Sequence, residues 1–362
     1  MGMQFPQRDY SLVGRDGQLA VEAGLAKAEW YQCPIPRKRL KELMKRSDQP
    51  AVRDTFIWLG AMTLSGGLGV WLWGTWWCIP FFAVYGVLYG SASDSRWHEA
   101  GHGTAFRTRW MNDAVYHIAS FMIMREPTIW RWSHTRHHTD TLIVGRDPEI
   151  VAMRPPRLAK IIVNFLGLVD VPVAFYHMVV HAAGRLTAEE ETFVPEMERS
   201  KVSLIARIWL AVYAATIAGC FALGSILPAM LIGLPRFYGA WHHLMTGLTQ
   251  HAGLAEDTLD HRLNSRTVHL NPISRFIYWN MNYHVEHHMF PMVPYHALPA
   301  LHEAVKGDCP PAYRGLWETY REIVPAILRQ LRDPTHFVRR YLPDSARRSD
   351  DEAKGAEALT TA

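Results

Sequence analysis

The stretch WRWSHTRHHTD, Trp130 to Asp140, decides both the fold and the chemistry expected of this chain. It contains three histidines in the order H-x-x-H-H, namely His134, His137 and His138. On a helix, positions i, i+3 and i+4 lie on one face, so we expect the three imidazoles to point the same way. Neutral imidazole binds zinc, iron, copper and nickel. The stretch therefore favours a metal site, although clustered histidines also occur on helices without any function.

The same arrangement recurs elsewhere in the chain. The segment WNMNYHVEHHMFP repeats the H-x-x-H-H order, WHEAGHGT has two histidines at i and i+4, and one more histidine follows the last apolar segment. Chance does not account for this repetition, so we predict that these side chains gather as metal ligands. The predicted ligands are His98, His102, His134, His137, His138, His251, His284, His287 and His288.

The number of histidines indicates more than one ion. A structural zinc takes four ligands, and a catalytic zinc takes three protein ligands plus an open position. Eight or nine imidazoles exceed both, whereas two ions with four or five nitrogen ligands each fit the number. Iron that activates O2 is the leading candidate, and copper stays open on ligand type alone.

Composition excludes several other classes of protein. The net charge of +4 over 362 residues is too small to indicate a nucleic-acid partner. The four cysteines form no C-x-x-C pair, which argues against a disulfide scaffold and a thiolate zinc site. The N-terminal segment is polar and lacks the apolar core of a secretory signal.

Two long apolar regions predict membrane helices. Residues 55–93 contain no charged residue, and residues 202–248 form a second apolar region. Because about 20 residues cross a bilayer, each region is long enough for two spans. We predict an all-α integral membrane fold with four transmembrane helices arranged as two hairpins. The apolar segment 161–180 is interrupted by Asp170 and Pro172, so we expect it to lie on the membrane, with a fifth span as the alternative.

Basic residues flank the outer ends of both predicted hairpins and are absent from their short links. By the positive-inside tendency, both termini and the histidines should be cytoplasmic, in a helical cap above the spans of a multi-pass protein of the inner or plasma membrane. We expect a cytoplasmic arm at 1–53, a membrane domain at 54–340 and a disordered tail at 341–362.

Three histidine motifs carry a family resemblance. HEAGHGT, WRWSHTRHHTDT and NYHVEHHMFPMVPYHALPALH resemble the histidine boxes of the membrane fatty acid desaturase and alkane hydroxylase superfamily, whose members are non-haem diiron enzymes. The resemblance spans roughly residues 53–306, and residues 29–55 look most like the rhizopine-oxygenase-like subgroup. It implies that the eight box histidines bind two irons and that His251 adds a further ligand. Some relatives have an asparagine four residues before that position, where this chain has Gly247.

The resemblance also implies an activity. It is that of a membrane-bound oxygenase that uses O2 and two electrons to desaturate or hydroxylate a C–H bond of a lipid or a methylated small molecule. The chain has no flavin, nicotinamide, haem or iron–sulfur motif, so we expect a ferredoxin-type donor with its reductase to supply the electrons. The same boxes serve both reactions, so the sequence leaves the choice of reaction and the substrate open.

Two other classes of function compete with this interpretation. HEAGH also matches the H-E-x-x-H signature of zinc proteases, in which Glu99 would be the general base. A membrane zinc metalloprotease would, however, leave both H-x-x-H-H motifs without a role. A metal-binding or transport protein without catalysis is the third possibility.

Further residues are predicted to support the site. Metal-bound imidazoles usually donate their other N–H to a carboxylate or carbonyl. Asp140, Asp147 and Glu286 lie beside the boxes and are candidates for this role, with solvated loop charges as the alternative. His177 and His181 also lie at i and i+4, but with no third partner nearby we expect them to pack at an interface.

The predicted fourth span contains unusual charges for a membrane helix. Ionisable groups inside a membrane are costly and usually face a cavity or a partner. Helical spacing places Arg236, His243 and Gly247 on the face that leads to His251. We predict that they line the substrate pocket and that Arg236 and His243 contact a polar or anionic group. The alternative is that Arg236 pairs with a backbone carbonyl. The basic segments 37–46 and 154–160 are candidate docking sites for the donor, or they only enforce the topology.

Overall fold

The computed structural model describes residues 8–26 and 29–343. The predicted disordered tail, 341–362, lies outside these residues except for its first three. The described residues form helices and short 3₁₀ turns, and they contain no β-strand beyond two isolated bridges, Thr267–Tyr283 and Val268–Tyr313. The prediction of an all-α fold is therefore confirmed.

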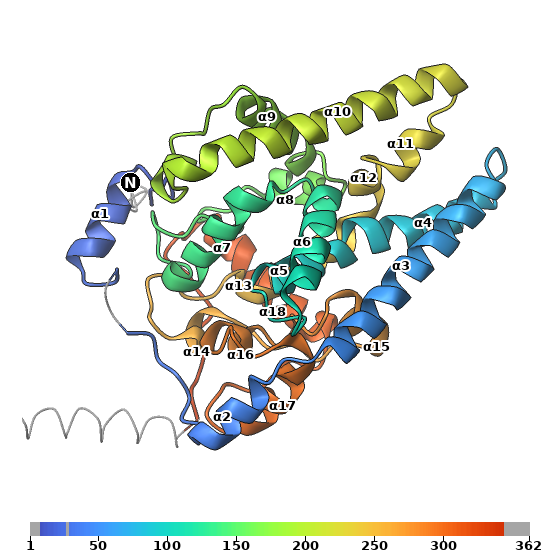
Figure 1. The fold of residues 1–362 in the computed structure, drawn as a ribbon. Coiled ribbons are helices and arrows are strands. Elements are labelled where there is room, and N and C mark those ends of the chain that lie inside the picture. Colours follow the sequence, from blue (N-terminus) through green and yellow to red (C-terminus); the bar gives the residue numbers. More distant parts are fainter. Residues whose placement is uncertain (1–7, 27–28, 344–362) are drawn as a thin grey trace, which may run out of the picture.

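An apolar helical hairpin projects from the body of the molecule as one arm (Figure 1). It consists of α3 (Asp48–Trp71) and α4 (Cys78–Gly90). Its outer surface exposes large apolar side chains such as Phe56, Leu64 and Trp71, while Trp58 is buried and donates a 2.8 Å hydrogen bond to the carbonyl of Leu88. Apolar groups that face outward are what a membrane hairpin requires.

A second arm lies apart from the first in Figure 1 and is formed by α10 (Arg199–Leu223) and α11 (Leu227–Leu231). Among the described residues, Glu196–Leu223 is the single segment whose length and composition meet the criteria for crossing a membrane, and most of it is exposed. The four-span topology therefore stays a prediction.

The predicted fourth span is not one continuous helix. The chain breaks it into α11, α12 (Pro235–Gly239) and α13 (Trp241–His251). Proline lacks the N–H that a helix interior needs, and Pro228 and Pro235 lie in the first turns of α11 and α12, while Gly233 adopts φ +92°. A further break at Ala240 separates α12 from α13, where the Ser91 hydroxyl donates to the Gly239 carbonyl and accepts from the His243 amide. Arg236 and His251 therefore do not lie on one continuous helix.

A close contact between glycines joins the first arm to α12, the helix that follows the second arm. A Cβ on Gly239 would lie 1.9 Å from the carbonyl oxygen of Gly86, so only glycine allows α12 to approach α4 this closely. Helix α4 ends at Gly90, and the hydroxyl of the next residue, Ser91, donates a 2.6 Å hydrogen bond to the Gly239 carbonyl. Helix α5 (Ala92–Gly101), which carries His98, begins there.

The apolar segment 161–180 forms two short helices, α8 (Leu158–Asn164) and α9 (Asp170–Ala182). Neither approaches the roughly 20 residues that a span requires. Val173, Tyr176 and Val179 on α9 are exposed, whereas Met178 and His181 are buried. Helix α9 thus turns an apolar face outward and packs its other face against α10. Its expected position on the membrane stays a prediction.

The remaining helices surround the histidines. In Figure 1, α5, α7, α13 and α16 lie near the centre of the molecule, and the two arms project away from them. The remaining elements are α1 (Arg15–Glu22), α2 (Arg37–Leu43), α6 (Arg109–Ile123), α7 (Pro127–Asp140), η1 (Glu190–Thr192), η2 (Glu196–Glu198), α14 (His261–Asn264), α15 (Pro272–Ile277), α16 (His284–Met289), η3 (Tyr295–Ala297), α17 (Leu298–Val305) and α18 (Leu316–Gln330).

Candidate metal centre

Helix α7 positions the first H-x-x-H-H motif. The side chain of Glu126 caps the helix by accepting a 2.7 Å hydrogen bond from the amide of Ile129, and Pro127 occupies its first turn. His134 and His138 point to one group of ligands, and His137 points to another. Adjacent helical residues lie about 100° apart, so His137 and His138 diverge into two groups that remain neighbours, with their ring centroids 5.8 Å apart.

All nine predicted histidines assemble into two groups, one of five and one of four. Within each group, one nitrogen from every ring lies within 4.8 Å of the others. The third box divides as the second does, with His284 and His288 in one group and His287 in the other. The five-histidine group contains His98, His102, His134, His138 and His287. The four-histidine group contains His137, His251, His284 and His288.

The Nε2 atoms within the groups approach one another closely. In the five-histidine group, the Nε2–Nε2 distances are 3.1 Å for His134–His102, 3.2 Å for His138–His134 and 3.2 Å for His287–His138. In the four-histidine group, they are 2.9 Å for His284–His251 and 3.0 Å for His288–His284. Nitrogens bound to one ion at about 2.1 Å and at a right angle to each other would lie roughly 3 Å apart.

The opposite ring nitrogens show which nitrogen is free to bind a metal. His134 Nδ1 lies 3.0 Å from Glu149, His137 Nδ1 lies 2.9 Å from Asp147, and His251 Nδ1 lies 2.8 Å from the Asn264 carbonyl. An Nδ1–H that donates to an oxygen leaves Nε2 with its lone pair. The Nε2 atoms of His134 and His251 are also the atoms that approach the Nε2 atoms of neighbouring rings within their groups.

Burial keeps most of the imidazoles neutral, the form that binds metal ions. It lowers the pKa of seven of them well below the ordinary value, and the neighbouring rings add to the effect in each case. The seven are His98, His102, His138, His251, His284, His287 and His288. His137 differs, because although burial opposes it, the Asp147 carboxylate raises the pKa of His137 to about 9. The donor set and the neutral form of these seven rings therefore fit two metal ions, and a metal bound at His137 would displace the proton of that ring.

Of the three carboxylates predicted to support the ligands, the structure places Asp147 beside one of the nine rings. Asp140 binds Arg146 at 2.9 Å and Arg136 at 3.6 Å. Glu286 binds His302 and Thr267, each at 2.5 Å. Within the described residues, neither Asp140 nor Glu286 pairs with a ring of the nine.

Sequence reasoning missed three other partners of the rings: Glu149, the Asn264 carbonyl and Thr141. The hydroxyl of Thr141 lies 3.2 Å from Nδ1 of His288. Glu149 follows Asp147 by two residues, and this short acidic motif was the available signal. The contact of His251 with Asn264 depends on a backbone carbonyl, so no side-chain pattern could have indicated it.

The zinc-protease alternative is not supported. His98 and His102 share their group with three more histidines, which exceeds the ligand number of a protease zinc. Glu99 accepts hydrogen bonds from the Thr104 hydroxyl at 2.7 Å and from the Tyr295 amide at 3.0 Å. Burial raises the pKa of Glu99 to about 7. Its contacts make it part of the packing around α5 rather than a base aimed at a metal-bound water.

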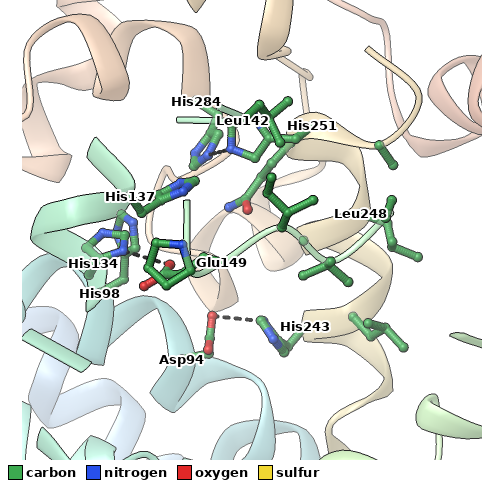
Figure 2. A pocket seen from close by; sticks show the side chains of 18 of the residues that line it. Asp94, His98, His134, His137, Leu142, Glu149, His243, Leu248, His251 and His284 are labelled. Atoms are coloured by element: carbon green, nitrogen blue, oxygen red, sulfur yellow. Dashed lines mark hydrogen bonds and ion pairs between the residues drawn. The ribbon is translucent and has the colours of Figure 1, made fainter. Parts of the chain in front are cut away.

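A cavity of about 240 Å³ lies beside the histidines and is lined by rings from both groups, as Figure 2 shows. Gly247 lines this cavity, and so does His243, whose Nδ1 lies 2.8 Å from the Asp94 carboxylate. Arg236 lines a second cavity of about 270 Å³ and donates a 2.7 Å hydrogen bond to the Gly90 carbonyl. The carbonyl contact weighed as the alternative for Arg236 is thus present in the structure.

The two cavities share part of their walls. Arg125 and His243 line both of them, together with Trp130, Val151 and Leu244. The guanidinium of Arg125 lies 4.8 Å from the ring centroid of Trp97 and 4.6 Å from that of Trp130, and it binds Asp94 at 2.6 Å. A polar cluster therefore stands where the cavities meet.

Comparisons with known proteins agree with this fold and site. The family model for fatty acid desaturases matches residues 74–320, which is more than half of the chain. The chain is 27% identical over 277 residues to a probable fatty acid desaturase of Sorghum bicolor, covering 70% of this chain and 69% of the relative. It is 24% identical over 274 residues to an omega-6 fatty acid desaturase, endoplasmic reticulum isozyme 1, of Glycine max, covering 66% and 71%.

A third relative is the sn-2 acyl-lipid omega-3 desaturase (ferredoxin), chloroplastic, of Arabidopsis thaliana. It is 25% identical over 233 residues, covering 58% of this chain and 51% of the relative. The fold and the two histidine groups thus define an all-helical oxidoreductase of the histidine-box class. The chain belongs to the fatty acid desaturase family. The resemblance to this superfamily is confirmed, and the rhizopine-oxygenase-like subgroup stays a prediction.

Proposed function

We propose that this protein is a membrane-bound diiron oxygenase that uses O2 and two electrons to desaturate or hydroxylate a C–H bond of a lipid or a methylated small molecule. The observation that carries the proposal is the convergence of nine imidazoles into groups of five and four, in a member of the desaturase family. When bound, the two irons would supply the activation of O2 and the removal of hydrogen from carbon.

The protein's own residues would hold and orient this centre. Each group offers one nitrogen per ring to one ion, and Asp147 and Glu149 fix the rings of His137 and His134 through their Nδ1 atoms. Such partners orient the ligands and increase their basicity. Six of the nine rings are buried and three, His102, His138 and His251, are partly buried, which limits the access of water to the centre.

The cavity beside the histidines is the proposed substrate site. Gly247 leaves room beside α13, and His243, Asp94 and Arg125 place polar groups on the wall. We propose that the adjoining cavity extends the site toward Arg236 and that His243 and Arg236 contact a polar or anionic part of the substrate. The Gly90 carbonyl holds Arg236 but uses one of its five N–H donors, so the remaining donors could serve such a contact.

A membrane location supports this role. The two arms expose apolar side chains, and the helices that carry the nine histidines lie in the body from which the arms project (Figure 1). We propose that the arms form the two predicted hairpins of four spans and that both termini and the histidine centre are cytoplasmic. Lipid substrates would then enter from the bilayer beside the cavities.

We propose a ferredoxin-type donor with its reductase, as the name of the Arabidopsis relative suggests. The ring of Trp30 stacks on His261 with centroids 4.2 Å apart, and His261 lies 5.0 Å from His288. These rings offer a short route from a partly exposed residue to the four-histidine group. Helix α2 follows closely in the chain and exposes basic side chains: Arg37, Lys38, Arg39 and Lys41.

The second predicted docking segment, 154–160, offers fewer accessible basic side chains to a donor than the sequence indicated. Arg154 is buried, and it lies 3.4 Å from Glu256, so it is not available to a partner. Arg157 and Lys160 are exposed. If charge guides docking, turnover with an acidic ferredoxin should fall as salt rises. Turnover that salt leaves unchanged would contradict docking by charge.

Product analysis tests the proposed reaction. The purified protein would be supplied with iron, a ferredoxin, its reductase and O2, and then incubated with acyl lipids and with methylated polar compounds. We expect mass spectrometry to detect a product lighter by two hydrogens, heavier by one oxygen or lacking a methyl group, and its absence without O2. A loaded enzyme that consumes no O2 with any of these substrates would contradict the proposal.

A further inference from the structure

A third group of metal-ligand side chains lies away from the nine histidines. His177 and His181 lie at i and i+4 on α9, and Glu190 begins the 3₁₀ turn η1 shortly after that helix. One ligand atom from each residue lies within 4.8 Å of the others. The sequence indicated no third partner for the two histidines, and the structure supplies one, because the loop after α9 folds back over the helix.

The contacts within this group match those of a metal site. His181 Nε2 lies 3.1 and 3.0 Å from the two oxygens of Glu190, and His177 Nδ1 lies 3.3 Å from one of them. The two rings have centroids 5.8 Å apart, compared with 4.4 to 5.2 Å for the i, i+4 pairs among the nine histidines. Ligands of one ion at about 2.1 Å lie roughly 3 to 3.4 Å apart.

A neighbouring side chain provides a second, independent observation. Glu126 is 7% exposed and lines the same cavity as His177, His181 and Glu190. Its Oε2 caps α7, whereas its Oε1 is buried and has no hydrogen-bond partner among the described residues. A buried carboxylate oxygen without a partner is costly, and a cation nearby would offset that cost.

We propose that His177, His181 and Glu190 form a third metal site, which binds a divalent transition metal such as zinc and directs an open position into the 270 Å³ cavity. Two imidazoles and one carboxylate are the ligand set of zinc sites that keep a position for water or another ligand. The same cavity contains Arg236 and adjoins the cavity beside the nine histidines. A cation there could bind an oxygen-rich group at the far end of a molecule that extends between the two cavities.

An ion pair between Glu190 and protonated histidines is the competing explanation for these contacts. It predicts the same distances but no bound metal, so metal content separates the two explanations. The proposal does not depend on the identity of the ions at the nine histidines or on the reaction.

The test compares zinc content between matched variants of the full-length protein in detergent. Each protein is equilibrated with zinc and passed through a weak chelating resin, and its metals are measured by mass spectrometry. We expect Glu190→Gln and His181→Ala to contain one zinc ion per chain fewer than the unmodified protein, with unchanged metal at the nine histidines. His117→Ala removes an exposed histidine outside the group and should lose nothing.

Cobalt(II) provides a readout that does not depend on counting ions. Cobalt added to the zinc-depleted protein should give visible absorption bands of a site with nitrogen and oxygen ligands, and these bands should be missing from Glu190→Gln. Because glutamine keeps the shape of glutamate, this variant should also keep the elution volume of the folded protein. Equal zinc content and equal cobalt spectra in all four proteins would overturn the proposal.

Discussion

The chain uses the H-x-x-H-H motif twice, on α7 and on α16, in different surroundings. On α7, the carboxylates of Glu149 and Asp147 hold the Nδ1 atoms of His134 and His137. On α16, the hydroxyl of Thr141 lies beside His288, and the buried Nδ1 atoms of His284 and His287 have no hydrogen-bond partner among the described residues. Identical motifs therefore need not make equal contributions to a metal site.

The difference has an electronic consequence. A carboxylate behind an imidazole increases its basicity, whereas a hydroxyl changes it little. Each group contains rings from both helices, since α7 gives His137 to the four-histidine group and α16 gives His287 to the five-histidine group. We infer that the two carboxylate-backed rings of α7, His134 and His137, bind their ions more strongly. The α16 rings complete the sites together with His138, whose buried Nδ1 also has no hydrogen-bond partner among the described residues.

Removal of a ligand should have the largest effect. We expect His137→Ala and His287→Ala each to abolish turnover, because each variant removes a ring from a different group. Each should also reduce the metal content by about one ion per chain. Metal analysis and a turnover assay measure both effects, with the exposed His117→Ala as the control. A variant that keeps both ions and normal turnover would contradict the assignment of that ligand.

Replacement of the carboxylates should have the next largest effect. Asp147→Asn and Glu149→Gln keep the shape of the side chain but remove its charge, so metal affinity should fall about 10- to 100-fold. Competition with a chelator of known affinity measures this loss. If the affinity stays the same in both variants, α7 and α16 do not differ as we infer.

The Thr141 hydroxyl should contribute less. Thr141→Val removes the bond that the hydroxyl donates to the His137 carbonyl and its neutral contact with His288. A neutral hydrogen bond is worth about 0.5 to 1.5 kcal/mol, so the loss of the contact with His288 should lower the affinity by roughly 2- to 13-fold. The same chelator competition applies, with Thr139→Val on the exposed side of α7 as the matched control. A loss as large as that of Asp147→Asn would remove the distinction between the two helices.

The smallest effect on metal binding is expected at Asp140. Its carboxylate binds Arg146 and Arg136 rather than a ligand ring, so Asp140→Asn should leave metal affinity within about twofold. The variant should instead lower the free energy of unfolding, by roughly 1 kcal/mol, because its arginine partners lose a charged acceptor. Chelator competition and thermal unfolding distinguish these outcomes, and a large loss of metal would show that Asp140 supports the site after all.

Sequence patterns anticipated the clustering of the nine histidines better than its division into two groups. The three motifs were found because local spacing records which residues share a helix face, and His251 was found from its place after the last apolar segment and from the family resemblance. The division of each H-x-x-H-H motif between two groups depends on where α5, α13 and α16 meet α7, and local spacing does not contain that information. Hydropathy likewise overlooked the breaks at Pro228 and Pro235, although both residues are visible in the sequence.

Contacts between distant residues account for most of the remaining differences. Asp140 was a reasonable partner for a ring by its position in the motif, yet the helix turns it toward Arg146. Glu190 follows His181 by nine residues, and only the folding of the intervening loop brings them together. Arg236 lies on a wall of the second cavity because Gly86 and Gly239 allow α4 and α12 to touch.

The position of the metals tests the central claim most directly. Crystals of the iron-loaded protein would be measured on both sides of the iron absorption edge. The account predicts two iron peaks per chain, one among His98, His102, His134, His138 and His287 and the other among His137, His251, His284 and His288. One peak only, or peaks that leave either group without iron, would contradict it.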